Sequence, residues 1–576
     1  MPHRRRLLTG FVLGAIVALA GCTSAGPEPV PTVTAQAQAP AQETTVLASA
    51  DPAELATELS RMFFTQAPVA LVVPEDDAAA SLTAGSLAVT LGVPVLLAGE
   101  GPTADLLAEE LERLGTETVV TIGDSADLFS SSGEDSATPD GESPAETPTL
   151  APDVEVVAAS GDAASLGALL GRELTEGTPV AEGEQITALA ALSVDAPTVL
   201  RLAGAPAPGP APTETAGAPE DDDAPVLPVV ADTARIEGAT VLSDGTPAQA
   251  AAVATARAAG ASVLSVPSGD PRASSEAITA LAAADPGAVV GLGPSFGSDD
   301  VLSWRVATAA TGVELPGGTQ LVFDGGKRYS ALYGTPGSGA LGVLGEQGIS
   351  ETIARAQQHA AALDAHTEDT VLPSLEIIAS IASAGAGADG DYSATRPVEE
   401  LRPLVDAAGE AGLYVVLDLQ PGRTDFLTQA RLYEELLLLP HVGLALDPEW
   451  RLKPGQVHLR QIGSVEIDEV NQVVEYLADL TRENRLPQKL LILHQFRLSM
   501  LVDRDRLDTS RSELALMIHV DGQGSQPAKN DTWNVLRRDA PDVYWGWKNF
   551  YDEDLPMLNP EQTMQIEPLP HLVSYQ

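Results

Sequence analysis

Four acidic side chains in the second half of the chain end or directly follow short apolar runs. Asp418 ends the run LYVVLD, Asp447 and Glu449 follow HVGLAL, and Asp521 follows LALMIHV. Apolar runs of this length are typical of buried parallel strands. The carboxyl ends of parallel strands meet on one face of an α/β barrel, where such barrels build their sites. We therefore expect these four carboxylates to line one mouth.

Carboxyl groups gathered around one rim can hydrolyse a glycosidic bond. One carboxylic acid protonates the leaving oxygen, while a second carboxylate attacks the sugar or activates a water molecule. Mutual repulsion raises the pKa of one member of such a group and keeps it protonated near neutral pH. We assign Glu449 as the acid and Asp521 or Asp447 as the nucleophile or base, with Asp418 as a fourth catalytic candidate. We expect neither a metal ion nor another cofactor in this reaction.

Polar and aromatic residues near the same strand ends are candidates for holding a substrate. Tryptophan rings stack on sugar faces, and amide, imidazole and ammonium groups hydrogen-bond to hydroxyl groups. One candidate, Glu376, lies nearer the start of its strand, so its place at the mouth is the least direct. The predicted substrate-binding residues are Glu376, Gln420, Trp450, His494, Gln495, Trp545 and Lys548.

A structural interpretation of the acidic residues stays open. A carboxylate at a strand end often caps the following helix or pairs with an arginine. Arg423, Arg451 and Arg497 are close enough in sequence to serve as such partners.

A metal-dependent interpretation also stays open. His494, His519 and Asp521 stand at or near two successive strand ends and could ligate a metal ion, as in metal-dependent hydrolases built on barrels. The first strand, however, ends in Tyr333-Gly334 and carries no histidine pair.

The elements that position these residues alternate strand and helix from about residue 320 to the end. Seven strands are clear from their apolar runs, and an eighth is either Gln320–Phe323 or a short segment after Met557. This alternation is typical of a (β/α)8 barrel. The predicted fold class is α/β, with a TIM-like barrel over residues 320–576 that is complete or one strand short. The seven strands cover 330–334, 375–381, 413–419, 442–446, 489–493, 514–520 and 543–547.

The first half of the chain contains parallel-sheet α/β repeat units. Residues 52–129 and 226–310 each show the alternation of such a unit. Gly92–Leu96 (GVPVL) and Gly260–Leu264 (GASVL) occupy the same place in the two units, 168 residues apart, which indicates an internal duplication. Residues 130–225 are predicted to be acidic linkers, rich in Pro and Ala, around a degenerate α/β unit.

The first unit carries several short motifs in a fixed order, namely Asp77-Ala78-Ala79-Ala80, Ser86-Leu87-Ala88, Leu91–Leu97 (LGVPVLL) and Thr121-Ile122-Gly123. In this order they resemble the cell wall-binding repeat 2 family. The sequence departs from the family pattern at Ala98, where the family has threonine, and at Gly123, where it has two glycines. The resemblance implies that these units bind an anionic polymer of the cell wall.

The chain is strongly acidic, with a net charge of -49. This charge excludes unaided binding to nucleic acid, which needs a basic face. Residues 22–326 hold 44 acidic and 8 basic side chains, whereas residues 327–576 hold 37 and 21. Binding of the first half to an anionic polymer would therefore need bridging Ca²⁺ or Mg²⁺. The alternative is that the units are acidic spacers.

Residues 1–21 have the layout of a signal peptide, with Arg4–Arg6 followed by the apolar segment Leu7–Ala20. The segment ends in Leu-Ala-Gly-Cys22, and Cys22 is the only cysteine. This resembles the bacterial lipoprotein signal, in which the cysteine is acylated and becomes the mature amino terminus. The resemblance implies a lipid anchor on the outer face of the cell membrane. Residues 22–51, rich in Pro, Ala and Thr, are predicted to be a disordered tether.

Together these features predict a wall-associated lipoprotein whose barrel binds a glycan and is a candidate glycoside hydrolase. A non-catalytic wall-binding or scaffolding lipoprotein is the first alternative. A metal-dependent barrel hydrolase is the second.

Overall fold

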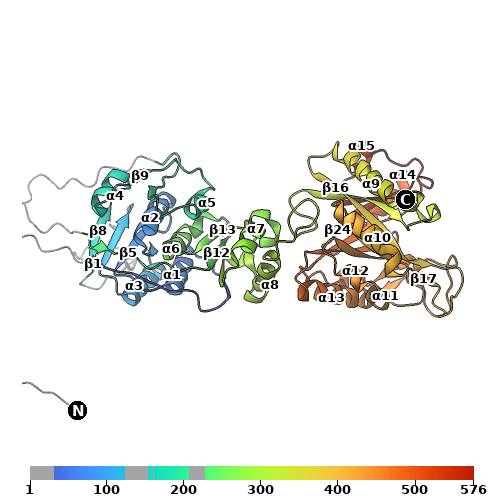
Figure 1. Ribbon diagram of the computed structural model, residues 1–576, viewed down its shortest axis with the longest axis horizontal. Coiled ribbons are helices and arrows are strands. Elements are labelled where there is room, and N and C mark those ends of the chain that lie inside the picture. Colours follow the sequence, from blue (N-terminus) through green and yellow to red (C-terminus); the bar gives the residue numbers. More distant parts are fainter. Residues whose placement is uncertain (1–31, 124–153, 160, 206–226, 232) are drawn as a thin grey trace, which may run out of the picture.

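The computed structural model describes residues 32–123, 154–159, 161–205, 227–231 and 233–576. Within them the chain forms an amino-terminal α/β half and a carboxyl-terminal barrel, joined through a narrower waist next to α7 (Ser275–Ala284) and α8 (Asp299–Ala309) (Figure 1). None of the described helices is long and apolar enough to cross a bilayer. The predicted signal peptide at residues 1–21 and the predicted lipidation site at Cys22 lie outside the described residues.

Two four-stranded parallel sheets build the amino-terminal half, each with three strands from one of the predicted units. The strand order is β6-β5-β7-β8 in the first sheet and β13-β12-β14-β3 in the second. The expected recurrence of the same order of elements is therefore confirmed. The first sheet and its helices are β5 (Val69–Pro74), α2 (Ala78–Leu91), β6 (Val95–Ala98), α3 (Pro102–Leu114), β7 (Thr118–Ile122) and β8 (Glu155–Ala159). The second are β3 (Thr44–Leu47), β12 (Ala239–Ser243), α6 (Ala250–Ala259), β13 (Ser262–Ser265), α7 and β14 (Ala288–Leu292).

The repeated glycine at Gly92 and Gly260 has the same structural role in both units. Gly92 ends α2, between β5 and β6, and Gly260 ends α6, between β12 and β13. Both are in the left-handed conformation, with φ of 71° and 108°. Glycine adopts this conformation without the steric cost that a side chain imposes. A Cβ atom on Gly260 would also lie 2.8 Å from the carbonyl oxygen of Ile236. The glycine that opens each repeated GxxVL segment is therefore a helix cap.

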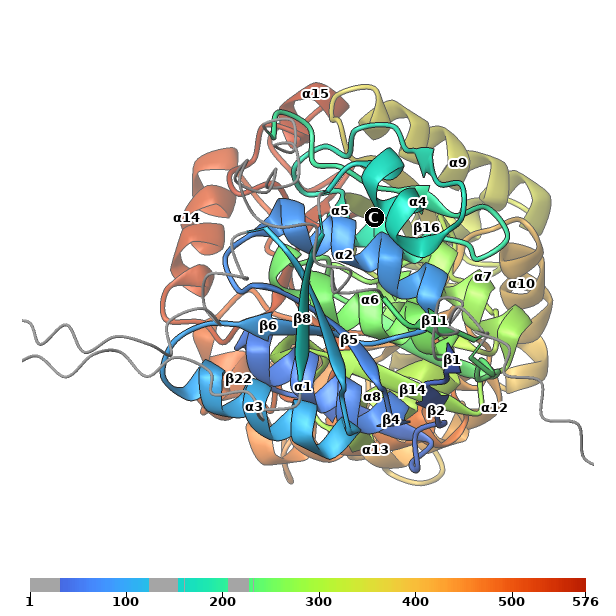
Figure 2. The ribbon, with the colours of Figure 1, turned by 90° about the vertical axis from the view of Figure 1, so that its left-hand side faces the viewer.

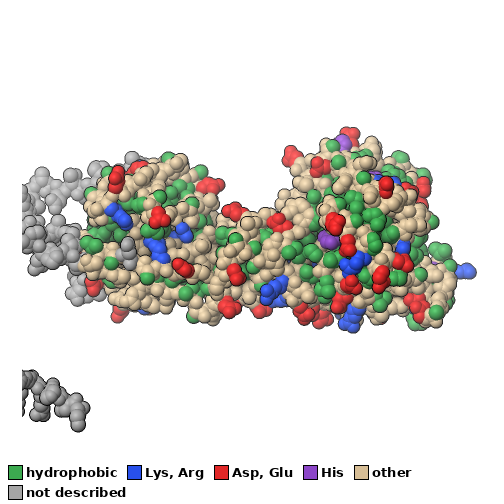
Figure 3. Space-filling view, in the orientation of Figure 1, with side chains coloured by type: hydrophobic (Ala, Val, Ile, Leu, Met, Phe, Trp, Pro, Cys, Tyr) green, Lys and Arg blue, Asp and Glu red, His purple; other side chains and the backbone are tan. Residues whose placement is uncertain are grey.

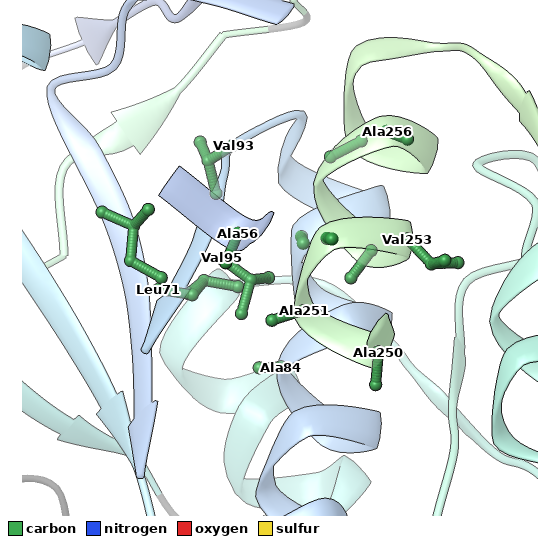
Figure 4. Close-up of a cluster of buried hydrophobic side chains, with 14 of the residues drawn as sticks. Ala56, Leu71, Ala84, Val93, Val95, Ala250, Ala251, Val253 and Ala256 are labelled. Atoms are coloured by element: carbon green, nitrogen blue, oxygen red, sulfur yellow. The ribbon is translucent and has the colours of Figure 1, made fainter. Parts of the chain in front are cut away.

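The two units share one hydrophobic core. Helices α2 and α6 pack against each other, and α1 (Pro52–Phe63) packs against α6. Small side chains allow helices to approach closely, and α6 is made almost entirely of alanine and valine. Residues 52–129 and 226–310 therefore form one packed body rather than two separate domains. Figure 4 shows part of this core, with Ala84 of α2 and Ala250, Ala251 and Ala256 of α6 near Leu71 and Val95 of the first sheet.

Residues 32–51, predicted as part of a tether, belong to this folded body. β1 (Thr32–Val33) pairs with β11 (Val229–Val230), and β2 (Gln36–Ala37) pairs with β4 (Phe64–Gln66). β3 forms the edge of the second sheet beside β14. The tether prediction is therefore wrong for these residues. Their strands are short, and two of the three partner strands lie far away in the sequence, so local composition did not reveal them.

The degenerate unit predicted between the linkers also joins the body. Its strand β8 completes the first sheet beside β7. Its helix α5 (Gln185–Ala190) packs against α2 and α6. Most of the predicted linker sequence, at residues 124–153 and 206–226, lies outside the described residues.

The carboxyl-terminal half is a closed barrel of parallel strands, as the alternation predicted. The order around the barrel is β15-β25-β24-β23-β21-β19-β18-β16, and β16 pairs with β15 to close it. The eighth strand is β25, the segment after Met557, and not Gln320–Phe323. The barrel strands are β15 (Lys327–Gly334), β16 (Thr370–Ala382), β18 (Tyr414–Leu419), β19 (Val442–Leu446), β21 (Lys489–His494), β23 (Leu514–Val520), β24 (Tyr544–Asn549) and β25 (Leu572–Tyr575).

Helices cover the outside of the barrel. Viewed along the long axis of the molecule, they lie around its periphery, behind the amino-terminal half (Figure 2). They are α9 (Ile349–Asp364), α10 (Val398–Glu410), α11 (Phe426–Leu432), α12 (Glu434–Leu437), α13 (Ile467–Glu483), α14 (Gln526–Arg537) and α15 (Pro560–Thr563).

Gln320–Phe323 closes the bottom of the barrel instead of forming a strand. The amide of Val322 donates to Oε1 of Gln488 (3.1 Å), and the amide of Gln488 donates to the carbonyl oxygen of Gln320 (2.8 Å). Val322 and Phe323 pack inside the barrel against Tyr329, near the start of β15. The amino-terminal half therefore attaches to the face at which the strands begin, opposite the mouth.

Arg272 anchors this attachment. Its guanidinium group is buried, pairs with Asp270 at 2.8 Å and lies 4.3 Å from the centroid of the Trp304 ring. It also donates to the carbonyl oxygen of Ser512 in the barrel (3.2 Å). One arginine therefore links the two halves of the chain through a buried contact.

Candidate functional site

The mouth of the barrel is organised around His494, the last residue of β21. Its Nδ1 lies 3.1 Å from Oδ2 of Asp521, which follows β23, and its Nε2 lies 2.6 Å from Oε1 of Glu376 on β16. All three side chains are buried. Hydrogen bonds from both ring nitrogens to carboxylates require a proton on each nitrogen. The geometry therefore fits an imidazolium ion held between two carboxylates.

Glu376 lies nearer the mouth than its place in the sequence suggested. β16 begins at Thr370, so Glu376 is in the middle of a long strand and not near its start. In the register of β15 and β16 it stands opposite Tyr333. Its side chain is fully buried in the barrel interior, within reach of His494.

Asp418 lies beside the His494 ring. Its Oδ2 accepts a hydrogen bond from the Tyr333 hydroxyl (2.8 Å), and its Oδ1 is 3.9 Å from Nε2 of His494. Gln420 donates from Nε2 to the same hydroxyl (3.2 Å) and accepts from the amide of Ala382 (2.9 Å). Both ends of the Gln420 amide group therefore contact the protein. Burial raises the pKa of Asp418 to about 6.

Tyr333 is a site residue that the sequence did not single out as a candidate. The signal was its place, because it comes directly before Gly334 at the end of the first barrel strand. The Lys548 ammonium group lies over the Tyr333 ring, with Nζ 3.5 Å from the ring centroid. Burial raises the pKa values of Asp418 and Glu449, and the positive charge of Lys548 opposes this effect.

Asp447 and Glu449 occupy the turn after β19. Oδ1 of Asp447 accepts from the amide of Glu449 (3.2 Å) and caps a short 3-10 helix at Pro448–Trp450. Burial, together with the nearby negative charges, raises the pKa of Asp447 well above its usual value. Glu449 is half-buried, and burial together with the charge of Asp521 raises its pKa to about 7.

The pKa of Asp521 is shifted in the opposite direction, below its usual value. Burial favours its neutral form, but the hydrogen bond and the charge of His494 outweigh burial and lower its pKa. Burial likewise favours neutral His494, yet the charge of Glu376 and the hydrogen bond to Asp521 raise its pKa well above the usual value. The mouth therefore combines an ionised carboxylate, Asp521, with a neighbouring carboxyl group, Glu449, that titrates near neutral pH.

The three nearby arginines are engaged mainly elsewhere, although the charge of Arg497 opposes the rise in the pKa of Glu449. Arg451 pairs with Glu469 at 2.9 Å. Arg423 donates to a backbone carbonyl and lies over the Tyr392 ring, while Arg497 lies near the Phe496 ring. Among the described residues, no arginine forms an ion pair with Asp418, Asp447, Glu449 or Asp521. Of the helix caps and arginine pairs that would give these four acids a purely structural role, the described residues show only the cap at Asp447.

The two candidate tryptophans lie in different places. Trp450 is half-buried beside the mouth acids, and its ring meets that of His458 edge to face at 5.3 Å. Trp545 lies near the start of β24 and packs on the outside of the barrel, 5.9 Å from Trp533 of α14. The prediction of Trp545 as a substrate-binding residue is therefore wrong, because its side chain points away from the interior.

Two further candidates, Gln495 and His519, form hydrogen bonds within the barrel. Oε1 of Gln495 accepts from Arg504 (2.9 Å), and Nε2 of Gln495 has no partner among the described atoms. Nε2 of His519 is 3.0 Å from the Ser574 hydroxyl. Burial lowers the pKa of His519 well below its usual value, so this ring is neutral.

The residues able to hold a metal differ from the set that the sequence suggested. Glu376, Asp418 and His494 offer ligand atoms within 4.8 Å of one another. Among the described residues they form the only such group, so His519 and Asp521 are not in it. The metal-dependent interpretation is therefore corrected in its residues, since Asp521 binds the far nitrogen of His494.

Comparisons with known proteins add little to this geometry. The chain matches no protein-family model and no curated protein. Among solved structures it is similar to Cwp6 from Clostridium difficile, with 14% sequence identity and a TM-score of 0.28. The match covers 70% of this chain and 66%, just under two thirds, of that chain. At this identity and score the likeness carries no inference about activity.

Proposed function

We propose that the barrel mouth hydrolyses a glycosidic bond in a glycan of the cell envelope or its surroundings, with Glu449 as the general acid. The observation that supports this most is the opposite titration of two neighbouring carboxyl groups. The pKa of Glu449 is raised to about 7, whereas that of Asp521 is lowered. Surroundings that push two pKa values apart are typical of an acid and its partner carboxylate.

Each residue has a defined role in this proposal. Glu449, protonated up to about pH 7, gives its proton to the leaving oxygen as the glycosidic bond breaks. Asp521, ionised and held by His494, attacks the anomeric carbon or removes a proton from the water that attacks it. Asp447 is less suited to this second role, because its pKa is raised and its Oδ1 caps the turn.

The remaining mouth residues position these groups and the substrate. Asp418 and Gln420 hold the hydroxyl of Tyr333, while Trp450 offers a half-buried ring for stacking on a sugar face. The contact with His458 orients that ring.

The test is reducing-sugar release from a panel of wall polysaccharides, chitin, β-glucans and xylans. The wild type should act on at least one of them. Glu449→Gln and Asp521→Asn should each lower kcat by about 10²-fold or more, as loss of general acid–base catalysis does. The matched control is Glu475→Gln, because Glu475 is an exposed residue on the outer helix α13.

Two outcomes would reject the hydrolase. One is full activity in Glu449→Gln. The other is a wild type that binds a glycan of the panel but releases no sugar, which would favour the non-catalytic binding alternative.

We further propose that the chain works in the cell wall, anchored to the outer face of the membrane through acylated Cys22. The amino-terminal half attaches to the bottom of the barrel, so the mouth opens on the far side from it. Acidic side chains are spread over both halves on the face shown in Figure 3. Bridging Ca²⁺ or Mg²⁺ would therefore link this half to an anionic wall polymer.

Sedimentation of the mature chain with purified cell walls tests this association. We expect the protein to sediment with the walls in Ca²⁺ or Mg²⁺ and to stay in solution after addition of a chelator. Failure to sediment under both conditions would leave the amino-terminal half as a spacer.

A further inference from the structure

We propose that the base of the mouth binds one divalent transition-metal ion, such as Zn²⁺ or Mn²⁺, through Glu376, Asp418 and His494. The three side chains are buried and place ligand atoms within 4.8 Å of one another. They come from β16, β18 and β21, and the hydrogen-bonded barrel holds these strands in place. The argument for this site does not rest on the proposed hydrolysis, although the two share His494, which holds Asp521, and Asp418.

Unpartnered oxygen atoms point to a missing cation. Oε2 of Glu376 and Oδ1 of Asp418 are buried and have no hydrogen-bond partner among the described atoms. Oδ1 of Asp418 lies 3.9 Å from Nε2 of His494, so it is directed into the group. A buried carboxylate oxygen without a partner is costly, and a cation placed between these atoms would remove that cost.

The surrounding hydrogen bonds orient two of the three ligands, His494 and Asp418. Asp521 binds Nδ1 of His494 at 3.1 Å, which leaves Nε2 to face Glu376 and Asp418. Tyr333 binds Oδ2 of Asp418, which leaves Oδ1 available. A carboxylate on the far nitrogen of a ligating histidine is the usual support of a metal-binding imidazole.

The charges of the mouth favour such an ion. The buried carboxylates Glu376, Asp418, Asp447 and Asp521 face only two buried cationic side chains at the mouth, His494 and Lys548, among the described residues. Two other buried cations nearby are engaged elsewhere, because Lys529 pairs with Asp554 and Arg504 binds Gln495. A divalent ion would replace the proton that lies between Nε2 of His494 and Oε1 of Glu376. That proton leaves to solvent as the metal–nitrogen bond forms, and the site gains one positive charge.

The ligand types select the kind of metal. One imidazole nitrogen and two carboxylates suit Zn²⁺, Mn²⁺ and related ions, whereas Ca²⁺ and Mg²⁺ prefer sets made of oxygen alone. The ion proposed here therefore differs from the Ca²⁺ or Mg²⁺ proposed to bridge the acidic amino-terminal half to wall polymer.

Equilibrium dialysis of the metal-stripped, full-length mature protein against Zn²⁺ or Mn²⁺, with elemental analysis, tests the site. We expect one tightly bound ion per chain. Glu376→Gln and Asp418→Asn should weaken its binding by 100-fold or more, and Asp521→Asn, which leaves the ligands in place, by about 10- to 100-fold. Glu475→Gln serves as the matched control and should bind as the wild type does. Circular dichroism spectra confirm that each variant is folded.

A second readout follows the histidine directly. Co²⁺ bound through His494 should give a visible absorption band that is lost in a folded His494→Gln variant. The proposal is overturned if the stripped wild type binds no tight ion, or if the folded Glu376→Gln and Asp418→Asn variants keep it. Sugar release without bound metal, in a wild type that takes up no ion, rejects this site and leaves the hydrolase standing. Metal binding without sugar release supports this site and rejects the hydrolase.

Discussion

His494 and Asp521 stand at the ends of the neighbouring strands β21 and β23, with Nδ1 of the imidazole 3.1 Å from Oδ2 of the carboxylate. The other ring nitrogen of His494 lies 2.6 Å from Glu376. One cationic ring therefore compensates two buried carboxylates. The charges of the two carboxylates raise the pKa of His494, and His494 lowers that of Asp521, so the ionisation of His494 and Asp521 is linked to the stability of the barrel.

Replacing His494 by glutamine should destabilise the barrel strongly. The change leaves Glu376 and Asp521 buried without their cation, which costs about 3–5 kcal/mol. Urea unfolding of the metal-stripped protein at pH 7 measures the loss. His519→Gln is the control, because His519 is equally buried but neutral and bound to Ser574, so about 1–2 kcal/mol is expected. Equal losses in the two variants would contradict an imidazolium at position 494.

The rate of sugar release should fall as the pH rises through about 7, where Glu449 loses its proton. Lys548→Met should move this descending limb to higher pH, because burial raises the pKa of Glu449 and the charge of Lys548 holds it down. The measurement is the pH profile of kcat/KM, read from the position of the limb and not from its height. Lys453→Met, which removes an exposed lysine paired with Glu466, should leave the limb in place. A descending limb at the same pH in Lys548→Met as in the wild type would argue against Glu449 as the titrating acid.

Because of Lys489, the free energy of unfolding should rise as the pH increases from 7 to 10. This fully buried lysine donates to the carbonyl oxygens of Leu439 and Val442, and burial lowers its pKa to about 7. Between pH 7 and 10 the unfolded chain therefore binds more protons at this residue than the folded chain does. The free energy of unfolding should gain up to about 1.4 kcal/mol per pH unit from this residue in that window. Denaturant unfolding at several pH values should show this gain in the wild type and its loss in Lys489→Met, with Lys453→Met unchanged. Parallel pH dependence in the wild type and Lys489→Met would rule out the effect.

Arg272→Ala should loosen the junction between the two halves. The change leaves Asp270 buried with only Arg305, 3.2 Å away, and removes the contacts with Trp304 and Ser512. Removing one partner of a buried ion pair costs about 3 kcal/mol or more. We expect a lower unfolding midpoint and faster proteolysis near residues 310–325. Arg402→Ala, at an ion pair on the surface of α10, should cost less than about 1 kcal/mol. If Arg272→Ala were as mild as this control, the junction would not depend on Arg272.

Cys22→Ala should release the protein from the membrane. Acylation of Cys22 is the only anchor that the sequence predicts, and the helices that the structure describes do not span a bilayer. Phase separation in Triton X-114 should move the protein from the detergent phase to the aqueous phase. A variant that remains in the detergent phase would show that another segment holds it.

The sequence alone was enough to predict the class of fold and the position of the mouth. Apolar runs such as Val442–Leu446 and Leu514–Val520 have these same bounds in the structure, because a strand buried on both faces leaves a continuous apolar signal. The rim acids followed from the parallel direction of the strands. Short strands such as β3 and β25 have no comparable signal, since their stability comes from partners far away in the sequence.

The identity of the interior face could not be read from the sequence. A period of two residues shows that Trp545 and Trp547 share one face of β24, but it does not say which face is inside. The structure turns both toward α14 and places Lys548 over Tyr333 in the interior. The sequence by itself determined the types and the order of the residues that make the site. Only the closed barrel decided which carboxylate is ionised and which keeps its proton, because pKa values depend on distances between side chains from different strands.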